Sequence, residues 1–95
     1  MRLRFERLLV DTEPQHCLFT SEPYVVFTKA GFTVAADVLI KKPHKSLERS
    51  VLISPQSLST PLLDRMSNNN YRLTGVEVWI YKDGQERTSR YKVED

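Results

Sequence analysis

The sequence predicts a small β-rich α+β fold, an antiparallel barrel or sheet with one short helix. Two patterns and the size of the chain support this prediction. Apolar and polar residues alternate over residues 24–40 and 76–81, as they do in strands that bury one face. Apolar residues at helical spacing follow a proline in residues 60–68. With 95 residues, 40% of them hydrophobic and 27% charged, the chain has the balance of one globular domain over residues 1–95.

The N-terminal part is expected to hold one strand and one loop. Leu3 and Phe5 alternate with charged side chains, which predicts a first strand over residues 3–10. The alternation fails at residues 8–10, which indicates a bulge or burial on both faces there. Residues 11–23 contain two prolines and several acids, and we expect them to form a loop.

Residues 24–40 predict a β-hairpin with a two-residue turn at residues 30–31. That turn sets Phe27 opposite Val34, so that the apolar faces of both strands coincide. The polar residues 41–49 that follow contain a proline, and we expect them to form a loop.

A short buried strand over residues 51–53 is expected to lead into the helix. A helix that began at Pro55 would hold Pro61 in its interior, where proline removes a backbone hydrogen bond and clashes with the preceding turn. We therefore predict a turn over residues 55–59 and a helix over 60–68, ended by the three asparagines that begin at residue 68.

The last part of the chain predicts a second hairpin. Its first strand covers residues 76–81, and Asp83 and Gly84 are a strong signal for a type I′ turn. Pairing around that turn sets Glu77 opposite Arg90, a cross-strand pair of opposite charge.

The predicted order is three strands, a short fourth piece, a helix and two strands. This order resembles that of the OB-fold, a five-stranded barrel with its helix between the third and fourth strands. The resemblance implies an OB-like barrel. An antiparallel sheet covered by one helix fits the same order, so both architectures stay open here.

Charge and cysteine content narrow the classes of function. Fourteen basic and twelve acidic residues give a net charge of +2, so there is no global basic field. Cys17 is the only cysteine, which excludes an intrachain disulfide and is typical of the reducing cytoplasm. No apolar run reaches the roughly 18 residues of a membrane span. We therefore expect a soluble, cytoplasmic protein that does not bind membranes, and the N-terminus does not resemble a secretory signal.

The residues that carry catalysis do not form a recognisable motif. His16 and Cys17 are adjacent in sequence, whereas a nucleophilic cysteine needs a base placed across space. The sequence holds no serine elbow and no glycine-rich phosphate loop, and its histidines and single cysteine do not have the spacing of a zinc site. We expect no catalytic residue, metal or cofactor, and an enzyme is the third hypothesis after two binding functions.

Two clusters favour single-stranded nucleic acid as the partner. Trp79 and Tyr81 lie on the face of the second hairpin opposite its aliphatic residues, where aromatic rings stack on bases. The basic segment 41–49 supplies cations for phosphates. The expected nucleic-acid-binding residues are Trp79, Tyr81, Arg72, Arg90, Lys92, Lys41, Lys42, Lys45 and Arg49. The leading hypothesis is a module that binds single-stranded DNA or RNA with little sequence preference.

The same residues support a second hypothesis from another class. The two aromatics also fit a contact beneath loop 11–23 or a dimer interface, and the basic run also fits a solvated loop. The alternative is a protein-interaction or assembly module of the phage or mobile-element accessory type, with a homodimer through an exposed strand edge as one form. The position of Trp79 separates the two hypotheses, because a buried ring offers no stacking surface.

Overall fold

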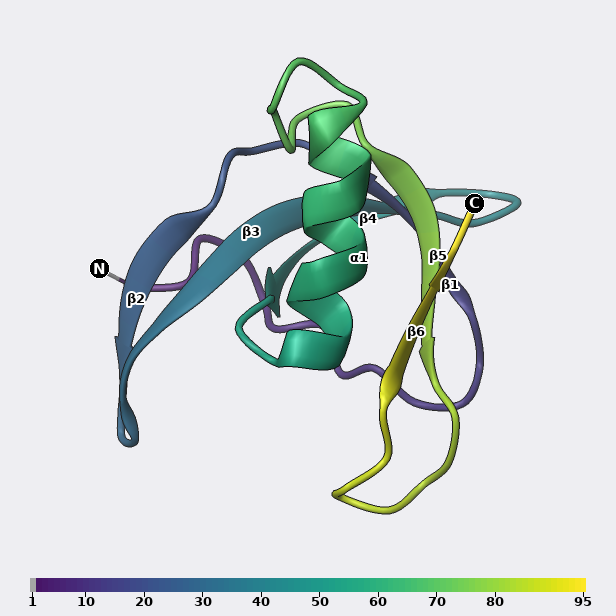
Figure 1. Ribbon diagram of the computed structural model, residues 1–95. Helices are drawn as coiled ribbons and strands as arrows, with labels where there is room; N and C mark the ends of the chain where they lie inside the picture. Colours follow the sequence, from purple (N-terminus) through teal and green to yellow (C-terminus); the bar gives the residue numbers. More distant parts are fainter. Residues whose placement is uncertain (1) are drawn as a thin grey trace.

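The computed structural model describes residues 2–95, in which four strands precede one helix and two strands follow it (Figure 1). The elements are β1 (Gln15–Phe19), β2 (Tyr24–Thr28), β3 (Gly31–Lys41), β4 (Ser46–Leu52), α1 (Gln56–Ser67), β5 (Glu77–Lys82) and β6 (Tyr91–Glu94). All named strands pair antiparallel in one six-stranded sheet, and its end strands β2 and β6 do not pair with each other. The β-rich α+β class is confirmed. Of the two architectures that the sequence left open, the structure has the antiparallel sheet and not the closed barrel, and the OB-like order is not confirmed.

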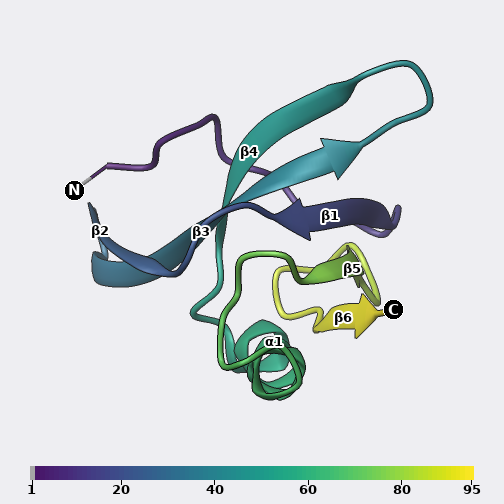
Figure 2. The ribbon, with the colours of Figure 1, turned by 90° about the horizontal axis from the view of Figure 1, so that it is seen from above.

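The long strand β3 organises the sheet. It pairs with β2 over its first half, with β1 near its end and with β4 along its other edge. β1 then pairs with β5, and β5 pairs with β6. α1 covers the face of the sheet that carries the main core, and it contacts β6 directly (Figure 2). The core residues of the strands and the helix are Cys17, Phe19, Ala36, Val38, Ile40, Val51, Leu58, Leu62, Val78 and Ile80.

A strand that the sequence did not indicate lies near the centre of the sheet. The expected loop 11–23 contains β1, which pairs with β3 on one side and β5 on the other. Its alternation covers only five residues, with Cys17 and Phe19 buried. Pro14 and Pro23, which favoured a loop, lie outside this strand and do not interrupt it.

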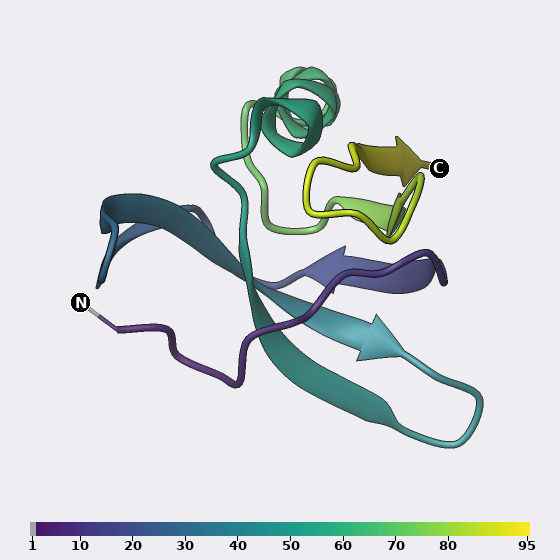
Figure 3. The same ribbon diagram turned by 90° about the horizontal axis from the view of Figure 1, so that it is seen from below.

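The first predicted strand, over residues 3–10, is wrong. The segment 2–14 is irregular apart from one isolated parallel bridge between Arg7 and Ser50. There the Leu8 amide donates to the Ser50 carbonyl at 2.8 Å. The first residues of the segment lie on the side of β3 that faces away from α1, whereas Leu8 and Val10 pack against the main core (Figures 2 and 3). It crosses β4 at one point, so it forms no continuous ladder.

The first hairpin is confirmed, but its predicted turn and register are wrong. The turn consists of residues 29–30, and Phe27 pairs with Phe32 instead of Val34. The side chain of Thr28 explains the difference, because its hydroxyl donates to the Gly31 carbonyl at 2.9 Å and accepts the amide of residue 30 at 3.2 Å. These bonds close the turn one position earlier than expected.

The predicted loop 41–49 is mostly strand. β3 continues to Lys41 and β4 begins at Ser46, so only residues 42–45 form a turn, and Arg49 lies within β4. The Lys42 amide closes this turn by donating to the Lys45 carbonyl at 3.0 Å. The short strand expected over 51–53 corresponds to the last two residues of β4 and the residue that follows them.

The helix begins at Gln56, four residues before the predicted start, and it contains Pro61. The amides of Leu58 and Ser59 donate to the Pro55 carbonyl, which opens the helix there. The early start places Leu58 one turn before Leu62, so that both side chains are buried in the core. That burial outweighs the backbone hydrogen bond that proline removes.

The predicted end of the helix is confirmed. The last helical residue is Ser67, and Asn68 caps the helix. Asn70 adopts a left-handed conformation with φ of 54°, which asparagine tolerates better than most residues.

The second hairpin is confirmed, but its predicted type I′ turn and register are wrong. Trp79 pairs with Glu94 and Tyr81 with Lys92, so residues 83–90 form a wide loop. Asp83 closes the base of this loop: its amide donates to the Arg90 carbonyl, and its carboxylate accepts the Arg90 amide, both at 3.0 Å. Glu77 therefore has no cross-strand partner in β6.

A buried carboxylate joins the first hairpin to β4 and to the N-terminal segment. Asp37 is only 2% exposed, and its Oδ1 accepts hydrogen bonds from the hydroxyls of Tyr24 at 2.5 Å and Ser50 at 2.8 Å. Arg4 lies 3.4 Å from the other carboxylate oxygen, and its guanidinium stands 4.4 Å above the Tyr24 ring. Hydrogen bonds of this kind, to a buried charge, are among the stronger ones in proteins.

Replacement of Tyr24 by Phe tests the weight of this network. The change removes a hydrogen bond to a buried carboxylate, and we expect the free energy of unfolding to fall by about 1.5–3 kcal/mol. Urea denaturation followed by circular dichroism measures the loss. Tyr81→Phe is the matched control, because the Tyr81 hydroxyl donates a hydrogen bond to an exposed carboxylate. The urea concentration at the midpoint of unfolding of this variant should stay near that of the wild type. Equal losses in the two variants would contradict the role given to Asp37.

Candidate functional site

The face of the sheet opposite α1, called the outer face below, carries the two predicted aromatics. Trp79 pairs in register with His16 on β1, and their rings stack with centroids 4.6 Å apart and planes 11° apart. Trp79 remains 40% exposed, whereas its neighbours Val78 and Ile80 are buried on the core face. The alternation of β5 therefore places the ring as the sequence predicted. β1 lies beside β5 and not over it, so segment 11–23 does not bury Trp79.

The charges on this face are mixed and partly paired. Glu77 Oε2 accepts a hydrogen bond from Lys41 Nζ at 3.2 Å and lies 2.5 Å from His16 Nε2. The contact with Lys41, and then that with His16, lowers the pKa of Glu77 below its usual value. The Tyr81 hydroxyl donates to Glu94 at 2.9 Å, and this bond raises the pKa of Tyr81. Cations and carboxylates therefore alternate around the exposed indole.

The structure brings together some of the predicted nucleic-acid-binding residues. Lys41, Trp79, Tyr81 and Lys92 share the outer face, and Lys92 is the direct cross-strand partner of Tyr81. Lys42 and Lys45 are exposed in the turn that begins directly after Lys41. Six of the nine expected residues, Trp79, Tyr81, Lys41, Lys42, Lys45 and Lys92, thus lie on or next to one face.

The three arginines lie elsewhere. Arg49 pairs in register with the buried Val38, so it points to the core side, where it lies 3.6 Å from Glu6. Arg72 belongs to the connection between α1 and β5, and Arg90 closes the loop 83–90 near the start of α1. The seven expected cations therefore do not lie on one continuous surface.

Sequence reasoning missed His16, which it placed in a loop. The signal was present but short, because His16 and Leu18 alternate with the buried residues Cys17 and Phe19 over five positions. Cys17 pairs with a residue 23 positions later in the chain, and His16 pairs with one 63 positions later. The position of His16 beside Trp79 is therefore visible only in the folded structure.

Cys17 is buried in the core, next to the half-buried His16. Burial raises the pKa of its thiol to about 12, so the thiol is neutral at physiological pH and is not activated as a nucleophile. Within residues 2–95 no group of three or more histidine, cysteine or acidic side chains is placed to hold a metal ion. No helix in this part of the chain is long and apolar enough to cross a membrane.

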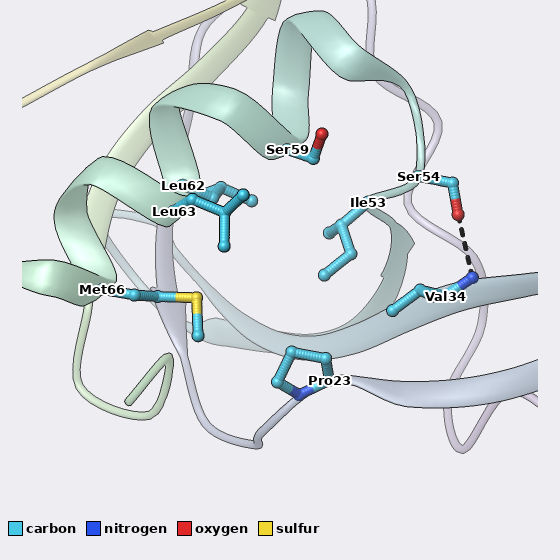
Figure 4. Close-up of a pocket in the computed structure, with 8 residues that line it drawn as sticks. All are labelled: Pro23, Val34, Ile53, Ser54, Ser59, Leu62, Leu63 and Met66. Atoms are coloured by element: carbon cyan, nitrogen blue, oxygen red, sulfur yellow. Dashed lines mark hydrogen bonds between the residues drawn. The ribbon is translucent and has the colours of Figure 1, made fainter. Parts of the chain in front are cut away.

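A second surface feature, which we call the apolar groove, lies between α1 and the hairpin of β2 and β3 (Figure 4). Its volume is about 370 Å³. Six apolar residues and two serines line the groove, and the apolar ones are Pro23, Val34, Ile53, Leu62, Leu63 and Met66. Ser54 accepts the amide of Val34 at 2.9 Å, which ties the end of β4 to β3 beside the groove. No local sequence pattern indicates this groove, because its walls come from three separate segments.

Comparison of the chain with protein-family models, with curated proteins and with solved structures finds no match.

The burial of Cys17 has a direct chemical consequence. In the folded protein at pH 8 we expect Ellman's reagent to modify much less than a tenth of the thiol within minutes, because both access and the thiolate form are suppressed. In denaturing guanidinium the same thiol should react completely. Rapid modification under native conditions would contradict the burial of β1 between β3 and β5.

Proposed function

We propose that this chain is a small cytoplasmic module that binds single-stranded nucleic acid through the outer face. The observation that supports the proposal is the exposed indole of Trp79, held by the stacked ring of His16 in the middle of the sheet. Stacking of a base on an aromatic side chain contributes about 1–3 kcal/mol and tolerates every base. Little sequence preference follows from this mode of binding.

Cations near Trp79 are available for the phosphates. Lys41 lies on one side of the His16–Trp79 stack, with Lys42 and Lys45 in the adjoining turn, and Lys92 lies beside Tyr81. Each neutralised phosphate releases a counterion, so affinity falls as salt rises. Three to four phosphate contacts on a single strand correspond to a slope of log K against log salt of about −2 to −3.

The carboxylates on the same face oppose the phosphates. Glu77 is held in its ionised form by Lys41 and His16, and Glu94 lies opposite Trp79. Their charges offset part of the attraction, so the proposed complex is weak and forms best at low ionic strength. This balance makes Glu77 a sensitive position for testing the proposal.

Removal of the indole should weaken binding. For Trp79→Ala we expect the affinity for a labelled oligo-dT strand to fall about 5- to 100-fold, the equivalent of one stacked base. Fluorescence anisotropy of the labelled strand at low salt measures it. Arg72→Ala is the control, because Arg72 lies away from the outer face and its loss should change affinity little. Unchanged binding by the Trp79 variant would refute the proposal.

Neutralisation of Glu77 should have the opposite effect. Glu77→Gln removes a negative charge next to the phosphates and frees Lys41 and His16, so the affinity should rise roughly two- to fivefold at low salt. The gain should shrink as salt is added, because the charges are exposed. Glu86→Gln, in the loop 83–90, supplies a control of equal charge. Unchanged or lower affinity in Glu77→Gln would contradict a path of the strand past this carboxylate.

A protein-interaction or assembly module is the second candidate, and a different surface favours it. Val25, Phe27, Phe32 and Leu63 are all more than half exposed around the apolar groove. Contiguous apolar surface of this kind commonly marks a contact with another protein. The two candidates use different residues, so one chain can carry both.

A further inference from the structure

The hairpin of β2 and β3 has one covered face and one open face. Residues Tyr24, Val26 and Ala35 on the first face are buried with Leu3 and Leu52 packed against them. The second face, which we call the apolar hairpin face, consists of Val25, Phe27, Phe32 and Val34. They form two cross-strand pairs, in which Val25 lies opposite Val34 and Phe27 opposite Phe32.

The apolar hairpin face has a projection at one end and a hollow at the other. Phe27 and Phe32, next to the turn, are 65% and 77% exposed, and their rings meet edge to face at 5.1 Å. Val34 and Pro23, at the base of the same hairpin, line the apolar groove (Figure 4). Residues on one face of a strand recur about every 7 Å, so projection and hollow are about 7–13 Å apart.

We propose that a second copy of this chain docks on this surface. The two hairpins pack face to face and antiparallel about a two-fold axis, and Phe27 and Phe32 of each copy enter the apolar groove of the other. This inference gives the partner for the second candidate function and depends on it. It does not depend on nucleic-acid binding, which uses the outer face.

The size of the exposed surface fits a weak dimer of this form. Aromatic side chains bury 150–250 Å² each, so the exposed parts of Phe27 and Phe32 amount to on the order of 300 Å² per copy. Val25 and Leu63 and the walls of the groove add to this area. Stable interfaces bury about 800 Å² per partner and transient ones bury less, so we expect a dimer that forms only at high protein concentration. In a two-fold dimer every contact occurs twice, so the phenylalanine pairs and the grooves of both copies are buried at the same time.

The charge distribution also favours a second copy. None of the residues of the apolar hairpin face or of the groove lining is charged. Contact between like charges is the main electrostatic obstacle to self-association, and it does not arise when two copies of this uncharged surface meet.

The first test is the oligomeric state of the full chain by sedimentation equilibrium at micromolar to submillimolar concentration. We expect the wild type to dimerise, and Phe32→Ser and Leu63→Ser each to raise the dimer dissociation constant about 30-fold or more. Leu9→Ser is the matched control, because Leu9 is exposed on the N-terminal segment and lies outside this surface. Circular dichroism checks that each variant is folded. A monomeric wild type, or unaltered dimers in both variants, would overturn the inference.

Mixing the two variants tests the reciprocal arrangement. Phe32→Ser lacks part of the projection but keeps the groove, and Leu63→Ser changes the groove but keeps the projection. In a mixed dimer, the intact projection of the Leu63→Ser copy meets the intact groove of the Phe32→Ser copy. In a dimer of either variant alone, both contacts contain a substituted residue. The mixture should therefore associate more tightly than each variant by itself. Association that does not recover on mixing would overturn the exchange of projection and groove.

Discussion

The buried carboxylate of Asp37 is the constraint on which the arrangement of the two surfaces depends. A charge that is 2% exposed must be paired and hydrogen-bonded, since leaving it unpaired would cost several kcal/mol. Tyr24 and Ser50 satisfy one oxygen and Arg4 approaches the other. These contacts connect β2, β3, β4 and the N-terminal segment at one point. The segment is thereby held against one face of the first hairpin, which leaves the apolar hairpin face as the open one.

Asp37 also lies where β3 changes partners. Before it β3 pairs with β2, and beyond it β3 pairs with β1, while β4 follows the other edge. The first hairpin and the outer face therefore occupy different parts of one sheet. The outer face gathers ionised side chains around Trp79, whereas the hairpin exposes uncharged apolar ones. One strand thus supports two surfaces of opposite chemical character.

The sequence predicted those features that depend on local pattern. The alternation of apolar and polar residues predicts the fold class, both hairpins and the outward position of Trp79. The run of asparagines, which tolerate a left-handed conformation, predicts the end of the helix. The exact turns were not predictable, because the hydroxyl of Thr28 and the carboxylate of Asp83 close them by specific hydrogen bonds. β1 could not be predicted, because an alternation of apolar and polar residues over only five positions is too short to distinguish a strand from a loop. The charge pattern around Trp79 required the register of β5 with β1, and the apolar groove required the packing of α1 against the hairpin.

The two proposed contacts depend on different forces, and this makes them separable in one protein. The binding proposed for the outer face depends in part on attraction between lysines and phosphates, and this part is screened over about 10 Å at 0.1 M salt. Association through the apolar hairpin face removes uncharged surface from water and is strengthened by salts such as sulfate. Rising ionic strength therefore weakens the first contact while it leaves or reinforces the second. In a dimer, moreover, each copy keeps its own outer face, so a long strand that reached both would gain in effective concentration without any new contact. A weak, charge-balanced site such as the one around Trp79 gains most from this doubling, which gives the apolar surface a functional reason on the same chain.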